Sequence, residues 1–223
     1  MPSEESPLLA TANGGSTSTD KDVHSRISDI RKLMQGTHDS GENFTFEWRI
    51  AQLTKLETMV HDHFEEMLDA LYKDLGKGRV EAAAFELGAL LDELVYLKKN
   101  LKRFMKPQDR PSPSLLIPAF SKITPMPLNG PAVLVIGPSN YPISISLMAV
   151  AGSLSAGNPT LLKPSELCPT SSKLLAKYVA EYFNPNVFQV IEGSVPETTA
   201  LLEQDWGLIH FTGSERVGRV RTV

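Results

Sequence analysis

Four short strand-like segments alternate with helix-length segments, and this alternation constrains the fold more than any other feature of the chain. The strand-like segments are residues 132–136, 160–162, 187–191 and 208–211, and the first of them is a continuous apolar run. The intervening segments are 143–156, 170–183 and 196–204. A short continuous apolar run is typical of a strand that is buried on both faces of a sheet. Strands that alternate with helices predict a parallel, wound sheet, so we expect an α/β fold.

Two long helical stretches precede this sheet. Apolar residues recur at helical spacing over residues 46–75, and a second apolar stripe runs from Leu87 to Phe104. Gly76 and Gly78 interrupt the pattern between them. The sequence therefore predicts an antiparallel pair of long helices, whose apolar stripes belong to the core.

The remaining segments complete a predicted division of the chain. Residues 1–40 are rich in Ser, Thr, Gly and Asp and are predicted to form a disordered tail, although residues 23–34 could form a short helix. Residues 41–106 hold the helical part. Residues 107–130 contain many prolines and predict an extended connector, with an edge strand near residues 121–124. Residues 131–223 hold the α/β sheet.

Charge and cysteine content exclude several classes of protein. The formal net charge of −4 gives no electrostatic reason to expect nucleic acid or an anionic membrane as a partner. No run of 18 apolar residues predicts a membrane span, and the N-terminus lacks the pattern of a secretory signal. The single cysteine, Cys168, excludes an internal disulfide and a cysteine-rich metal site, so we expect no bound metal and a reducing, cytoplasmic location.

Three corners with chemically capable residues follow three of the predicted strands. They read GPSNYP at 137–142, KPSE at 163–166 and GSERVG at 213–218. Because ligands of wound sheets bind beyond the carboxyl ends of the parallel strands, we expect these corners to share one rim.

Each corner has a chemical interpretation and a plainer one. Asn140 offers amide N–H donors that could stabilise an oxyanion. Lys163 offers a cation and Glu166 an acceptor for ribose hydroxyls or phosphate. Gly213 and Ser214 place small residues where a helix begins, which suits an anion. Taken singly, these are also ordinary turn residues and solvated side chains.

Two standard nucleotide motifs are absent. The Gly213-to-Gly218 spacing imitates a P-loop, but Arg219 and Val220 stand where that motif has Lys and Ser or Thr. No GxGxxG follows a strand. An unrelated phosphate-binding α/β protein is therefore the weakest interpretation.

The corners in their order resemble the aldehyde dehydrogenase family. The relevant stretches are GPSNYP, AGNPTLLKPSE, GSVPETTALL and HFTGSERVG, and upstream RIAQL at 49–53 and LDEL at 91–94 fit as well. The chain is most similar to the class 3 branch, which handles fatty and other hydrophobic aldehydes. The resemblance covers roughly residues 45–220 and implies a partial Rossmann-like sheet.

The resemblance also implies roles for the corners. Asn140 matches the family's oxyanion-hole asparagine, and Lys163 and Glu166 match residues that hold the adenosine ribose of NAD or NADP. The residues that match the motif packed against the cofactor's pyrophosphate and adenosine are Gly213, Ser214, Val217 and Gly218. In the family reaction a cysteine thiolate attacks an aldehyde, a hydride passes to the nicotinamide, and water releases the carboxylic acid.

The chain departs from the family pattern in two ways. The family's general-base glutamate, in an ELGG motif, and its nucleophilic cysteine, in a GQxC-like loop, both lie downstream of the Gly-Ser motif and do not occur in these 223 residues. We therefore expect the catalytic domain to be absent and the chain alone to be inactive. Cys168 lacks an activating neighbour and is expected to be structural. Ser139 stands where the family usually has Trp.

A second hypothesis is a catalytically dead NAD(P)-binding or regulatory remnant that associates with a full-length homologue. By resemblance, the strand near residues 121–124 is where family members often associate. The expected partners are thus an aldehyde substrate and a homo- or hetero-oligomeric copy, with no nucleic acid and no membrane span.

Overall fold

The fold has a four-stranded parallel sheet with helices on both faces. The computed structural model describes residues 18–111, 120–128 and 130–219. The strands are β3 (Val133–Ile136), β4 (Thr160–Lys163), β5 (Phe188–Val190) and β6 (Leu208–Phe211), in the order β5-β4-β3-β6. The connecting helices are α6 (Ser144–Ser155), α7 (Pro169–Tyr182) and α8 (Val195–Leu202). The predicted α/β class and the four predicted strands are confirmed.

The strand order produces a switch point beside β3. The chain moves from β3 outward to β4 and β5, then crosses back to place β6 on the other side of β3. All three pairs are parallel, and the register joins Ile136 to Lys163 on one side and to Phe211 on the other. The carboxyl ends of β4, β3 and β6 therefore lie next to one another at a single rim.

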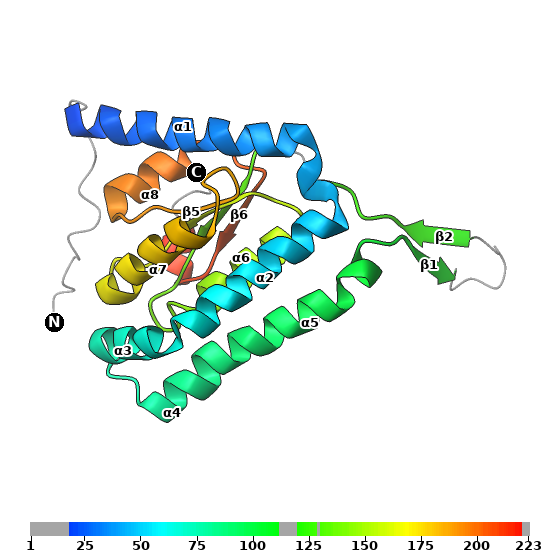
Figure 1. The fold of residues 1–223 in the computed structure, drawn as a ribbon. Helices are drawn as coiled ribbons and strands as arrows, with labels where there is room; N and C mark the ends of the chain where they lie inside the picture. The colour runs from blue at the N-terminus through cyan, green and yellow to red at the C-terminus, as the bar shows by residue number, and fades with distance from the viewer. Residues whose placement is uncertain (1–17, 112–119, 129, 220–223) are drawn as a thin grey trace, which may run out of the picture.

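Two separate apolar cores cover the faces of the sheet. On one face Val133 and Val135 pack with the helices α2, α3, α5, α6 and α7. On the other face Leu134 and Ile136 pack with α1 and α8 (Figure 1). Alternate residues of β3 thus enter opposite cores, because successive side chains of a strand point to opposite faces. This two-sided burial explains why the strand is an unbroken apolar run.

The upstream helices form the outer part of the larger core. They are α2 (Phe46–Asp62), α3 (Phe64–Leu75), α4 (Arg79–Glu81) and α5 (Ala89–Phe104), preceded by the 3-10 turn η2 (Glu42–Phe44). A π-helical segment, η3 (Ala82–Gly88), leads into α5. Helices α2 and α5 run antiparallel along each other, as predicted (Figure 1). The predicted helix over 46–75 is in fact two helices, because the chain breaks at His63.

Residues 18–40 correct the prediction of a disordered tail. They form a single helix, α1 (Ser18–Ser40), that lies across α8 and one face of the sheet (Figure 1). Ile27, Ile30 and Met34 recur at helical spacing and are buried. The polar composition of the segment indicated disorder, but these apolar residues have a core to enter. Residues 1–17, the rest of the predicted tail, lie outside the described residues.

The proline-rich connector contains a hairpin. Strands β1 (Gln108–Pro111) and β2 (Phe120–Ile123) pair antiparallel, with Gln108 opposite Ile123. The hairpin extends away from the rest of the molecule (Figure 1). The predicted strand near 121–124 therefore exists, one residue earlier, and β1 was not predicted. Among the described residues, no helix is long and apolar enough to cross a lipid bilayer.

Candidate functional site

A cleft of about 410 Å³ lies at the switch point. Its walls come from the segments that follow β3, β4 and β6, and from α8. The lining residues from these segments are Gly137, Pro138, Ser139, Lys163, Ser165, Glu166, Leu167, Thr198, Leu202, Thr212, Gly213, Ser214, Val217 and Gly218. A cleft beyond the carboxyl ends of parallel strands is where open α/β sheets bind ligands. Six of the seven predicted site residues therefore come together here.

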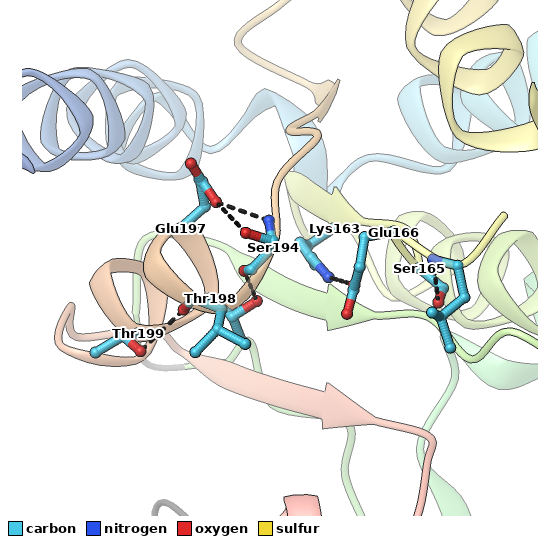
Figure 2. Close-up of polar contacts among 9 residues, drawn as sticks. Lys163, Ser165, Glu166, Ser194, Glu197, Thr198 and Thr199 are labelled. Carbon is cyan, nitrogen blue, oxygen red and sulfur yellow. Dashed lines mark hydrogen bonds and ion pairs between the residues drawn. The ribbon is translucent and has the colours of Figure 1, made fainter. Parts of the chain in front are cut away.

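A lysine and a glutamate form the charged wall of the cleft. Lys163 ends β4 and is only 4% exposed, and its Nζ lies 2.5 Å from Oε2 of Glu166 (Figure 2). Burial of Glu166 opposes its ionisation, but the hydrogen bond from Lys163, a backbone N–H and the Lys163 charge hold the pKa of the carboxyl below its usual value. The cleft therefore presents a paired cation and a partly exposed carboxylate.

The start of α8 forms a wall that the sequence analysis did not assign. Oε2 of Glu197 accepts hydrogen bonds from the backbone N–H of Ser194 at 2.7 Å and from its hydroxyl at 3.4 Å (Figure 2). The Ser194 backbone bond is the largest of the effects that lower the pKa of Glu197. This capping box fixes the first turn of α8, and the next residue, Thr198, lines the cleft. The sequence feature that could have identified Thr198 as a cleft residue is its position shortly after the third predicted strand.

The Gly-Ser corner forms the opposite wall. Gly213 and Ser214 lead into α9 (Glu215–Gly218), a single turn. A Cβ on Gly213 would lie 2.5 Å from the ring of Phe211, and one on Gly218 would lie 3.3 Å from it. The two glycines thus let the chain fold closely over the Phe211 ring. The corner is exposed, so its backbone is open to a ligand in the cleft.

Gly137 allows the corner after β3 to form. A Cβ at this position would lie 2.1 Å from Oγ of Ser146 in α6. The Gly137 N–H donates to the Lys163 carbonyl at 3.0 Å and so continues the pairing of β3 with β4. A side chain at residue 137 would force the Ser146 side chain to move, so glycine suits this close approach of the corner to α6.

Asn140 is the predicted site residue that lies outside the cleft. It is exposed, three residues beyond Gly137 on the same rim. Its carbonyl accepts a hydrogen bond from Nζ of Lys77 at 2.8 Å, whereas its side chain makes no hydrogen bond within the part of the chain that is described. The amide donors of Asn140 are therefore uncommitted, and the residue does not line the cleft that holds the charged wall.

Cys168 has the environment of a structural thiol. It is 1% exposed, and its Sγ donates to the Ser139 carbonyl at 3.2 Å. Burial raises the pKa of the Cys168 thiol, and the nearby charges of Asp74 and Glu86 raise it further. A protonated, buried thiol is a poor nucleophile, as the sequence analysis expected. Across residues 18–111, 120–128 and 130–219, no cluster of His, Cys, Asp and Glu could hold a metal ion.

Known proteins resemble this chain in sequence and in structure. A family model described as the aldehyde dehydrogenase family matches residues 11–220. The chain is 41% identical to aldehyde dehydrogenase family 3 member H1 of Arabidopsis thaliana, over 86% of this chain and 40% of the relative. It is 37% identical to 4,4'-diaponeurosporen-aldehyde dehydrogenase of Staphylococcus aureus, over 78% of this chain and 37% of the relative.

A solved structure agrees with the fold. The substrate-bound state of Staphylococcus aureus AldH superposes with a TM-score of 0.80 and 32% sequence identity, over 88% of this chain and 42% of that one. The chain spans 34–40% of the length of the first four relatives. Several relatives are family 3 members, which confirms the predicted similarity to the class 3 branch. The wound sheet and the cleft at its switch point are consistent with the family model that matches residues 11–220. The chain belongs to the aldehyde dehydrogenase family.

Proposed function

We propose that the cleft binds NAD or NADP and that the chain supplies the cofactor-binding part of an enzyme that oxidises a hydrophobic aldehyde to a carboxylic acid. One observation carries the proposal. The Lys163–Glu166 pair and the Gly213–Gly218 corner line the same cleft of about 410 Å³ at the switch point of the sheet. That volume is within the usual range of ligand pockets, roughly 300–1,000 Å³.

The residues of the cleft fit a dinucleotide. The Glu166 carboxylate, 45% exposed, can accept hydrogen bonds from ribose hydroxyls, and Lys163 can donate to a hydroxyl or a phosphate oxygen. Gly213 and Gly218 let the backbone approach the ligand without an intervening side chain. When bound, the nicotinamide supplies the hydride acceptor of the reaction.

The aldehyde chemistry assigns the remaining role to Asn140. Its uncommitted amide N–H groups are suited to stabilise the oxyanion that forms when a nucleophile attacks the aldehyde carbon. The nucleophile must come from residues outside these 223, because Cys168 is the single cysteine and is buried and protonated. The 223-residue polypeptide should therefore bind the cofactor without oxidising aldehydes.

Calorimetric titration of the purified chain with NAD and NADP tests the proposal. We expect saturable binding of at least one dinucleotide. Binding should weaken in Glu166→Ala and Lys163→Met, and Lys98→Met should leave it unchanged because the Lys98–Glu57 pair joins α5 to α2 away from the cleft. A folded wild-type chain that binds neither dinucleotide contradicts the proposal.

A second candidate function is a regulatory remnant that associates with a full-length homologue. The hairpin of β1 and β2 supports it, because it projects from the body and leaves Ile123 57% exposed (Figure 1). Co-purification with a full-length family member, and its loss in Ile123→Asp, would favour this role. This role would be contradicted if the chain stayed monomeric when mixed with the full-length homologue.

We also propose a division of the chain into segments and a location for the protein. We retain the boundaries 41–106, 107–130 and 131–223 for the helical part, the connector and the NAD(P)-binding sheet, to be tested by limited proteolysis. A cytoplasmic location is likewise a prediction, and one relative is a chloroplastic enzyme. Imaging of the tagged protein would decide it.

A further inference from the structure

A buried ion pair lies directly behind the corner that carries Asn140. The Glu86 side chain is fully buried, and its Oε1 lies 2.5 Å from Nζ of Lys77, whose side chain is 11% exposed. Neither residue lines the cofactor cleft. The proposed cofactor-binding role therefore gives no reason for two charges to be buried at this place.

The pair holds the Asn140 corner from both sides. Nζ of Lys77 donates to the Asn140 carbonyl at 2.8 Å and lies 3.7 Å from the centre of the Tyr141 ring. Oε2 of Glu86 accepts from the backbone N–H of Ser144 at 3.0 Å. Ser144 begins α6, which has no side-chain cap of its own, so Glu86 supplies the carboxylate that a helix N-terminus favours.

Local backbone features bring the two charges together. Gly76 ends α3 with a φ of 65°, a left-handed conformation that suits glycine, and Lys77 follows immediately. Glu86 lies in the π-helical segment η3, and segments of this kind occur frequently at functional sites. A Cβ on Gly88 would lie 2.9 Å from the Ala83 carbonyl, so the π-helical turn requires a glycine there.

Stability alone is a weak reason for such a pair. Removing two charges from water costs about as much as their attraction returns, so a buried ion pair often adds little to the free energy of folding. The contacts of the Lys77–Glu86 pair instead converge on the short segment from Asn140 to Ser144. The Asn140 side chain has no hydrogen bond in the described part of the chain, so the bond from Lys77 to its carbonyl is the polar contact that anchors this residue.

We propose that Lys77 and Glu86 are positioning residues that hold the Asn140 backbone, and with it the amide donors, in the place where an oxyanion forms. The proposal rests on the oxyanion-stabilising role assigned to Asn140. Lys77 acts on the loop through the Asn140 carbonyl and the Tyr141 ring, and Glu86 holds Lys77 and the start of α6.

Nuclear magnetic resonance and hydrogen exchange on the 223-residue chain test the proposal. The variants are Lys77→Met, Lys77→Arg and Glu86→Gln, with Lys98→Met as a matched control that breaks another Lys–Glu pair. We measure the order parameter of the Asn140 side-chain amide and the exchange of the backbone amides of residues 139–141 and 143–144, since Pro142 has no N–H. Urea unfolding of each variant measures the global stability separately.

Lys77→Met should lower the order parameter of the Asn140 amide and speed exchange in the loop by about tenfold or more, because a hydrogen bond to a charged group is lost. Lys77→Arg should restore part of the order, and Lys98→Met should change neither quantity. The proposal is wrong if Lys77→Met leaves the loop unchanged, or if the loop changes only in proportion to global stability. Cofactor titration of the wild type tests the proposed function independently, so the two can fail separately.

Discussion

The pair of Lys163 and Glu166 should respond asymmetrically to the loss of each partner. The Lys163 side chain is 5% exposed and its Nζ has one hydrogen-bond partner among the described residues, whereas the Glu166 side chain is 45% exposed. Glu166→Gln therefore leaves a buried ammonium without its carboxylate. Lys163→Met removes the buried charge and leaves a carboxylate that water already reaches.

The exposure of each partner sets the expected magnitude. Removing one partner of a fully buried pair costs about 3–5 kcal/mol. Because water reaches Glu166, we expect Glu166→Gln to lower the free energy of unfolding by about 1–3 kcal/mol. Lys163→Met should cost less than about 1 kcal/mol, since an apolar chain of similar length fills the same space.

Urea unfolding followed by circular dichroism measures both variants against the wild type. A protein of this size should lose roughly 2–4 °C of melting temperature per kcal/mol, which gives a second measure. Both variants should weaken dinucleotide binding, although their stabilities differ. The reasoning is refuted if Lys163→Met destabilises the chain as much as Glu166→Gln does.

Three further predictions follow from other contacts. Met34→Ala should lower the free energy of unfolding by about 2–4 kcal/mol, measured by urea titration, and a change near zero would show that α1 is not docked. Cys168 should resist an aromatic disulfide reagent in the folded chain and react fully in urea, whereas rapid reaction without urea would contradict its burial. The hydrogen bond from Tyr182 to Asp62 raises the pKa of the phenol to about 12, so its contribution to stability is complete below pH 10 and is lost as the pH rises through about 12. The pKa of Tyr178 is raised as well, by its hydrogen bond to Glu66, so ultraviolet titration should show one fewer late-titrating tyrosine in Tyr182→Phe than in the wild type. An unchanged number would refute the assignment.

The sheet could be predicted closely from the sequence. A strand buried on both faces tends to be an unbroken apolar run, so residues 132–136 locate β3 to within a residue. The segment 208–211 coincides with β6, although that strand is partly exposed. Gly157, with a φ of 85°, ends the α6 segment where the sequence places the end of a helix. For β3 the local pattern suffices because burial of both faces leaves little choice of residue.

The cleft could be predicted only in part. The order of the corners placed Lys163, Glu166 and the Gly-Ser turn together, because parallel strands bring their carboxyl ends to one rim. The position of the strand ends did not predict that Asn140 lies outside the cleft or that Thr198 lines it. Those details depend on how far each loop runs past its strand before a helix begins, which local pattern does not specify.

By itself, the sequence determined the strands, the helices between them and the corners that follow three of the strands, since each depends on neighbouring residues. Only the tertiary structure decided that residues 18–40 form a packed helix, that Asn140 does not line the cleft, and that Lys77 donates to its carbonyl. The physical reason is that burial and ion pairing depend on partners far along the chain. Glu86 and Ser144, for example, are separated by 58 residues and meet at 3.0 Å only when the chain folds.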